Sequence, residues 1–168
     1  SDQILANLAE KRFGKLIKDE ILQRQIEKIS HSPFLTGILN AMPFPVMILN
    51  KTNQIIFVNR EFFNFVVYGK EISIIGLKQG EALFCKNALT SPGGCGTTKF
   101  CKVCGIKKAI LSEFQGISGF QESVITTIEG YNINVTVFTE SFTVEGEKFY
   151  FLFVKDTSSE KRRRSLER

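Results

Sequence analysis

Apolar residues recur with helical spacing in the first part of the chain. Between residues 4 and about 30 they return every three or four positions and charged residues fill the gaps, which predicts one long amphipathic helix. The apolar positions are Leu5, Leu8, Phe13, Leu16, Ile17, Ile21, Ile26 and Ile29. Pro33 should end this helix, because proline disfavours helical backbone in the residue before it, and a short helix over residues 34–40 should follow. The broad polar face favours a helix that forms a dimer or transmits a signal over one that packs only on its own domain.

Alternating and continuous apolar runs predict five strands. Residues 45–50 and 54–59 form two β-rich runs, joined by a turn in which Asn53 suits the positive φ of a tight hairpin. Asn59 should cap a helix that follows the second run. The other three strands are expected at residues 120–128, 131–142 and 147–156. The last of these is apolar on both faces, so it should lie at the centre of the sheet or be covered on both sides.

All the cysteines of the chain fall within residues 80–105. They are Cys85, Cys95, Cys101 and Cys104. The last two form a C-x-x-C pair followed by Gly105, a turn in which two thiolates can converge on one metal ion and which the glycine should open. A helix expected over residues 102–114 would place its N-terminus at this pair and favour the thiolate form that a metal requires. We therefore predict that the four thiolates bind Zn2+ or a [4Fe–4S] cluster, with Zn2+ placed first because C-x-x-C-G is the usual zinc half-site.

Other interpretations of these cysteines stay open on the sequence. Free cysteines often serve core packing, but these four are not scattered along the chain. A structural disulfide suits a small, loop-rich secreted scaffold, which this composition does not describe. A transient redox disulfide between Cys101 and Cys104 is a further alternative, although such a pair needs no partners like Cys85 and Cys95.

Composition describes one soluble domain with extensions. The chain has 168 residues, 43% of them hydrophobic and 23% charged, and no apolar run that approaches membrane-spanning length. The formal net charge is +5, and the part from Lys155 onward holds six Lys or Arg against three Asp or Glu. Because most of the excess charge belongs to this tail, we expect no nucleic-acid partner. Clustered cysteines without a targeting segment indicate a cytoplasmic location.

Three stretches resemble PAS domains. The opening MPFPVMILNKTNQIIFVNREFFNF is similar to the PAS hairpin that ends in Asn and leads into the first core helix. The exit FVKDTSSEKRRRSLER is similar to the junction where a PAS sheet passes into a following helix, and GEALFCKNALTSPGGCGTTKFCKVCG resembles an insertion in a subset of bacterial PAS domains that precede histidine kinase modules. The resemblance implies an α+β fold: a five-stranded antiparallel sheet with helices on one face, an N-terminal helix and a C-terminal exit helix.

The same resemblance implies a sensory module without catalytic residues of its own. Residues 1–32 would form the N-terminal helix, residues 33–155 the PAS domain with its cysteine-rich insertion at 80–105, and residues 156–168 the start of a linker helix. The four cysteines would respond to redox state, oxygen or a metal. Asp156 and Thr157 would pass the response to the exit helix by bonding backbone N–H groups at its start.

The implied partners are a second copy of the chain through the terminal helices, a C-terminal histidine kinase domain and, through it, a response regulator. In an alternative interpretation Zn2+ only staples the loop, while a small molecule in the pocket or a neighbouring domain does the sensing.

Haem is disfavoured because the single histidine, His31, lies next to a helix end outside the domain core. A flavin photoreceptor is disfavoured because residues 83–86 do not match Asn-Cys-Arg-Phe, and an independent enzyme because no nucleophile–base pair, carboxylate dyad or phosphate loop is visible.

Overall fold

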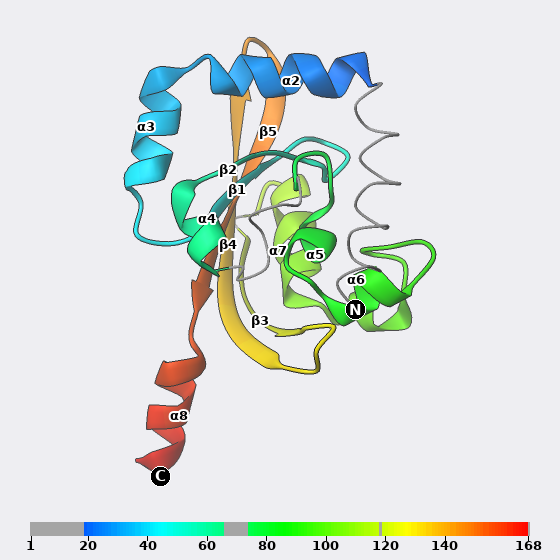
Figure 1. Cartoon of the computed structure of the whole chain (residues 1–168), viewed down its shortest axis with the longest axis vertical. Coiled ribbons are helices and arrows are strands. Elements are labelled where there is room, and N and C mark those ends of the chain that lie inside the picture. The colour runs from blue at the N-terminus through cyan, green and yellow to red at the C-terminus, as the bar shows by residue number, and fades with distance from the viewer. Residues whose placement is uncertain (1–18, 66–73, 118, 168) are drawn as a thin grey trace.

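The computed structural model of the chain describes residues 19–65, 74–117 and 119–167 (Figure 1). Its helices are α2 (Glu20–Ser30), α3 (Pro33–Ala41), α4 (Arg60–Phe65), α5 (Gln79–Ala82), α6 (Lys86–Thr90), the 3-10 turn η1 (Lys99–Lys102), α7 (Gly105–Phe114) and α8 (Ser158–Leu166). Its strands are β1 (Val46–Leu49), β2 (Ile55–Val58), β3 (Gly119–Thr126), β4 (Asn132–Val144) and β5 (Glu147–Asp156). None of the described helices is long and apolar enough to cross a bilayer.

The strands form one antiparallel sheet in the order β2-β1-β5-β4-β3. This confirms the predicted α+β class with a five-stranded antiparallel sheet. The strand that is apolar on both faces, β5, lies at the centre, as its pattern requires. The predicted turn and helix cap are also confirmed. Asn53 has a φ of 60° in the β1–β2 turn, and the Asn59 side chain accepts the N–H of Phe62 at the start of α4.

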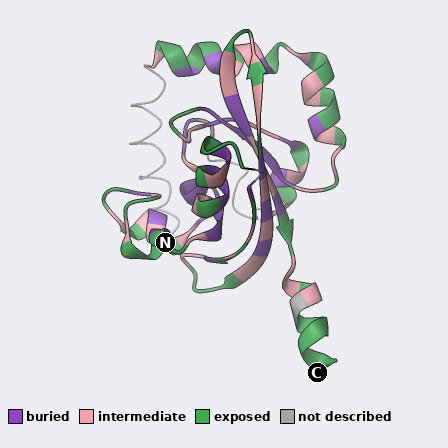
Figure 2. Cartoon of the chain, turned by 180° about the vertical axis from the view of Figure 1, so that it is seen from behind, coloured by how far each residue is buried: buried purple, intermediate pink, exposed green. Residues whose placement is uncertain are grey.

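Two apolar layers flank the sheet (Figure 2). On one face α4, α5 and α7 cover a core built from alternate residues of the strands, such as Leu49, Val137 and Leu152. On the other face α2 and α3 cover Val46, Ile48 and Phe149 near one end of the sheet. Figure 1 shows α2 lying across that end, while α8 leaves the opposite end. The helix at the exit is therefore remote from the N-terminal helices.

The predicted N-terminal helix does not run uninterrupted from residue 4 to residue 30. Asp19 has extended backbone (φ −86°, ψ 101°), and its carboxylate accepts the N–H groups of Ile21 and Leu22, so that a helix begins at Glu20. An aspartate can satisfy free N–H groups at a helix start, which favours a new beginning there over continuation. The earlier part of the predicted helix, with Leu5 to Ile17, lies outside the described residues.

Helix α2 packs on its own domain, the alternative that the sequence disfavoured. Leu22 and Ile29 are buried against the sheet. The buried Gln25 side chain donates to Glu147 and accepts from the amide of Asn50, and Lys28 forms an ion pair with Glu147 at 3.0 Å. These contacts tie α2 to the turn ends of the β1–β2 and β4–β5 hairpins. Its described apolar side is therefore not free to pair with a second copy.

The contact between α7 and the edge strand β3 is a contact between backbones. A Cβ on Gly105 would lie 2.2 Å from the carbonyl oxygen of Glu122, and one on Gly119 would lie 2.2 Å from that of Ala109. The sequence assigned Gly105 to opening the C-x-x-C turn, and this is wrong: its φ is not positive, and it begins α7. Gly105 is required because no side chain fits between the helix and the strand.

We expect Gly105→Ala to lower the free energy of unfolding by about 1–3 kcal/mol, because the new methyl group must push backbone away from backbone. Gly37→Ala is the matched control: Gly37 lies in α3 with open space around it, and alanine there should raise stability by about 0.5–1 kcal/mol. Urea unfolding of the two variants measures both changes. Equal stability of the two would contradict the close packing of α7 on β3.

Candidate functional site

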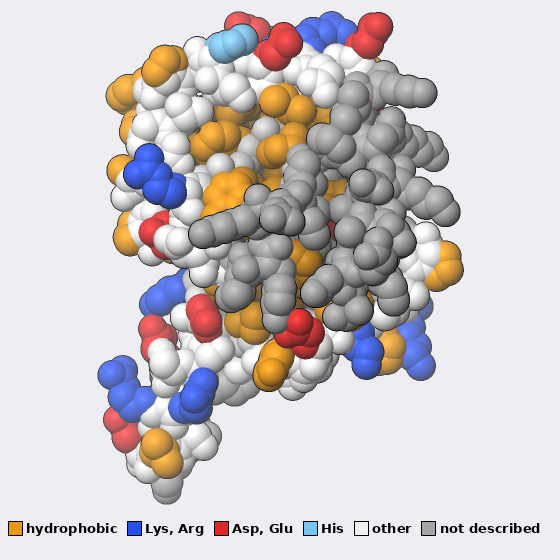
Figure 3. All heavy atoms as spheres, in the orientation of Figure 1, with side chains coloured by type: hydrophobic (Ala, Val, Ile, Leu, Met, Phe, Trp, Pro, Cys, Tyr) orange, Lys and Arg blue, Asp and Glu red, His pale blue; other side chains and the backbone are white. Residues whose placement is uncertain are grey.

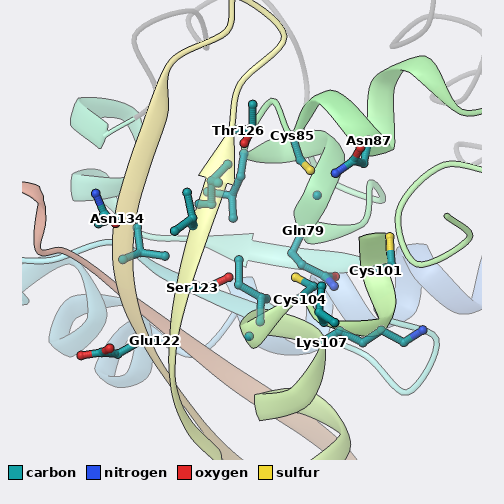
Figure 4. Close-up of a pocket in the computed structure, with 18 of the residues that line it drawn as sticks. Gln79, Cys85, Asn87, Cys101, Cys104, Lys107, Glu122, Ser123, Thr126 and Asn134 are labelled. Carbon is teal, nitrogen blue, oxygen red and sulfur yellow. The ribbon is translucent and has the colours of Figure 1, made fainter. Parts of the chain in front are cut away.

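A cavity of about 1270 Å³ lies beside the edge strand β3, and all four predicted site cysteines line it. Its walls come from α5, α6, η1, the start of α7 and β3, and it reaches as far as α8. Figure 4 shows Cys85, Cys101 and Cys104 around the cavity, with the side chain of Gln79 among them. Gln79 is 6% exposed, and its Oε1 has no hydrogen-bond partner in the described part of the chain. The cavity therefore combines sulfur atoms with a buried polar acceptor.

Cys85 is held by a turn that ends α5 and begins α6. The N–H of Cys85 donates to Gly80 at 2.9 Å and that of Phe84 to Glu81 at 3.2 Å, the Schellman pattern of a helix end. Phe84 occupies the left-handed position (φ 55°) that glycine normally takes, so backbone strain lies directly before the cysteine. Burial raises the pKa of the Cys85 thiol, while N–H groups at the start of α6 oppose this.

Cys95 is held against α5. Its N–H donates to Glu81 Oε1 at 3.1 Å, and a Cβ on Gly80 would come within 2.6 Å of its sulfur, so only glycine leaves room for it. Burial, together with the negative charge of Glu81, raises the pKa of the Cys95 thiol to about 12. The Gly80–Glu81 pair thus places Cys95, while burial and the charge of Glu81 keep its thiol protonated at neutral pH.

Cys101 lies in η1 and Cys104 occupies the N-cap position of α7, which confirms that this pair sits at a helix start. Burial would raise the pKa of the Cys101 thiol, but hydrogen bonds from Thr98 and Gly96 and the charge of Lys107 outweigh it and lower the pKa below its usual value. The Thr98 hydroxyl lies 3.2 Å from the Cys101 sulfur. The thiols in the cavity therefore differ in acidity, because the pKa of Cys101 is lowered and that of Cys95 is raised.

The structure brings the cysteines around one cavity but does not bring them together as metal ligands. All four are free thiols. Within residues 19–65, 74–117 and 119–167, no group of three or more Cys, His, Asp or Glu side chains is placed to hold a metal ion. Metal binding by Cys85, Cys95, Cys101 and Cys104 therefore stays a prediction, and it would need the segment to close further around the ion.

Several residues that shape the site escaped the sequence analysis. Glu81 and Thr98 act on individual cysteines, and Lys107 on Cys101, through contacts that no local pattern reveals. The sequence did contain one indication of these surroundings, because residues 82–112 contain five lysines and no Asp or Glu. The excess charge therefore belongs as much to the cysteine segment as to the tail. Positively charged side chains near a cysteine stabilise its thiolate form.

The exit junction holds α8 to the end of β4. Asp156 Oδ1 accepts the N–H of Ser158 at 2.9 Å, as expected for a carboxylate at a helix start. The Thr157 hydroxyl makes no such cap, contrary to expectation, and its backbone N–H donates to the Asn134 carbonyl at 2.8 Å instead. Ser158, which the sequence analysis missed, accepts the N–H of Asn134 at 3.1 Å. Thr157 also lines the cavity that the cysteines line.

We expect Glu81→Gln to lower the pKa of Cys95 below its present value of about 12, because the amide still accepts the Cys95 N–H but carries no negative charge. A lower pKa means more thiolate at a given pH. Iodoacetamide labelling across pH on chelator-treated protein, read by mass spectrometry, should show Cys95 of the variant reacting at lower pH than in the wild type, and Cys101 reacting at lower pH than Cys95 in both. Identical profiles for Cys95 would refute the role of Glu81.

Comparisons with known proteins identify the fold. No protein family model matches the chain, and no curated protein matches it in sequence. An RNA-binding light-oxygen-voltage receptor aligns with a TM-score of 0.56 at 9% identity, covering 79% of this chain and 35% of that one, and a fungal LOV domain photoreceptor with 0.50 at 12%, covering 78% and 99%. The PAS domain of an HTR-like protein from Haloarcula marismortui aligns with 0.48 at 17%, covering 76% and 97%. At such identities the likeness concerns the fold alone, and that fold is the PAS fold.

Proposed function

We propose that the chain is the sensory PAS module of a histidine kinase, in which Cys85, Cys95, Cys101 and Cys104 hold Zn2+ or a [4Fe–4S] cluster and α8 carries the output. The observation behind this proposal is that one cavity is lined both by the four cysteines and by Thr157 and Glu160 at the exit. Input and output groups thus border the same cavity at the edge of the sheet. The proposed stimulus is redox state, oxygen or the metal itself.

The four cysteine thiols are suitable ligands for Zn2+ or a [4Fe–4S] cluster. Four free thiols are available, and backbone N–H groups already point at three of them, Cys85, Cys95 and Cys101, which supports thiolate in a metal or cluster site. Five lysines between residues 82 and 112 supply positive potential. A bound ion would offset the charge of the thiolates and tie α5, η1 and α7 together. Closing of the segment is eased at Gly94 and Gly96, which already have positive φ.

Helix α7 is the element that would couple this site to the sheet. Cys104 directly precedes its first residue, Gly105, which lies on the β3 backbone. Near its C-terminus the buried Glu113 accepts the N–H of Ser141 in β4 at 2.9 Å. A shift of Cys104 would therefore pass through α7 to both β3 and β4. Strand β4 in turn holds Thr157 and Ser158 through Asn134.

A second copy of the chain is part of the proposal, since histidine kinases with such modules act as dimers in the resemblance drawn above. Leu22 and Ile29 of α2 are buried against their own sheet, so a second copy cannot use these two side chains. Contact through the rest of the terminal helices stays part of the proposal, and other surfaces can add to it. Aromatic rings along β4 and β5 offer one: Phe142 and Phe151 stack at 4.0 Å, and Phe138 and Phe153 follow. All four are only partly buried.

A second candidate function is a ligand-binding module in which Zn2+ only staples the loop. Two buried side-chain oxygens in the described part of the chain support it, because Gln79 Oε1 and Asn53 Oδ1 lack hydrogen-bond partners and both residues line the cavity. Such groups suit a small molecule with N–H or O–H donors. In this case sensing would depend on the small molecule, and exchange of the metal would leave the output unchanged.

Protein purified without oxygen should contain about one zinc ion or one four-iron cluster per chain. Elemental analysis gives the ratio, and absorbance separates the two, because a cluster is coloured and bleaches on oxidation whereas zinc gives no band. Cys101→Ser should lose the metal and loosen residues 80–105 while the sheet stays folded. A chain without metal, with four freely titrating thiols and an unchanged melting curve for Cys101→Ser, would rule out the metal site.

In the longer kinase, Asp156→Ala and Ser158→Ala should each weaken the dependence of autophosphorylation on the state of the cysteine site. Each removes one hydrogen bond between α8 and the strand end, worth about 1 kcal/mol, which alters a balanced switch without unfolding the domain. Thr157→Val is the matched control, since that hydroxyl caps nothing. Metal content should not change in any of them. Wild-type regulation in both alanine variants would show that transmission takes another route.

A further inference from the structure

The rim of the cysteine segment carries exposed apolar and cationic side chains next to each other. Phe100 in η1 is 55% exposed, and Val103, the first residue after η1, is 72% exposed. Lys99 and Lys102 of the same turn are exposed as well. In a 3-10 turn, side chains three residues apart eclipse one another, so the apolar pair and the lysine pair form two neighbouring rows. The turn is therefore amphipathic on its solvent side.

The sequence segment that contains this turn carries charge of one sign. Lys86 in α6 and Lys108 in α7 are also exposed, and no Asp or Glu occurs between residues 82 and 112. None of the ion pairs between described residues involves a lysine of this segment. Figure 3 shows Lys side chains flanking hydrophobic ones at the edge of the molecule where Figure 1 draws α6. We call Lys86, Lys99, Phe100, Lys102, Val103 and Lys108 the basic lip.

We propose that the basic lip binds the surface of an anionic lipid bilayer. Phe100 and Val103 would enter the boundary between headgroups and acyl chains, and the lysines would reach the lipid phosphates with their long stems lying along apolar surface. Lysines near an anionic membrane surface each add attraction, so the exposed lysines of the lip act together. This inference does not depend on the proposed metal site, since it rests on side chains that face solvent.

Other anionic partners fit the lip less well. A stable protein interface buries roughly 800 Å² on each partner, and one short turn with two apolar side chains offers far less. Binding of single-stranded nucleic acid uses several aromatic rings that stack successive bases, and the lip has one, Phe100. A bilayer needs neither a large rigid surface nor a series of rings. It needs apolar groups at a protruding point with cations around them.

The test is co-sedimentation of the full chain with phosphatidylcholine vesicles that either contain or lack phosphatidylglycerol. The chain should bind only the anionic vesicles. Phe100→Ala with Val103→Ala, and separately Lys99→Glu with Lys102→Glu, should each lower the partition coefficient at least about tenfold. Phe34→Ala is the matched control for the aromatic change, because Phe34 is 81% exposed in α3, remote from the lip.

Helix α8 is the rival cationic surface, with Arg162, Arg163 and an 88% exposed Leu166. Arg162→Ser with Arg163→Ser should leave binding to anionic vesicles within about twofold of wild type. Unfolding curves identify any variant that fails to fold, and Lys99→Gln with Lys102→Gln replaces the charge reversal in that case. The proposal is overturned if the wild type does not sediment with anionic vesicles, or if the arginine changes abolish binding while the lip changes do not. It is equally overturned if the lip changes affect capture of duplex DNA or an acidic polypeptide but not of vesicles.

Discussion

The contact on which the rest of the structure depends is the approach of α7 to the edge strand β3, backbone against backbone. At Gly105 and Gly119 a single added carbon would lie 2.2 Å from a carbonyl oxygen of the opposite element. A contact of this kind has no flexible side chain that can absorb a displacement, so helix and strand move as one body or separate. Because β3 pairs with β4 along its whole length, that body includes the strand that holds α8. The cysteine at the start of α7 is thus rigidly connected to the exit.

The elements that the sequence predicted correctly are those whose causes are local. Strand β5 shows its central position in its two apolar faces, and Asn53 and Asn59 reveal a turn and a helix start through properties of their own side chains. The errors concern long-range partners. The role of Gly105 depends on Glu122, seventeen positions later, and the docking of α2 depends on Glu147 in the last hairpin. No periodicity within α2 distinguishes its own sheet from a second copy as the surface that covers Leu22 and Ile29.

In the candidate site too, local features could be predicted from the sequence and long-range contacts could not. Spacing alone placed the four cysteines in one segment, and they do line one cavity. Their unequal chemistry could not be predicted, because the pKa of Cys95 depends on burial and on Glu81, and that of Cys101 on Thr98, Gly96 and Lys107. The sequence motif beginning Gly-Glu contains the two residues that hold Cys95, but only the folded chain shows that one leaves room for its sulfur and the other binds its N–H.

The distribution of lysines links the interior of the segment to its surface. Lys107 lines the cavity, where its ammonium lies 3.4 Å from the Gly96 carbonyl oxygen and helps to lower the pKa of Cys101. The other four lysines of the segment are exposed. Four thiolates around a divalent ion would carry two negative charges, so five lysines exceed what such a site has to balance, and the segment would stay positive with the ion bound. Charge that only stabilised thiolates would face the cavity. Lys99 and Lys102 instead lie exposed in the same turn as the exposed Phe100, directly before Val103, and this is the arrangement of a surface that meets an external anion.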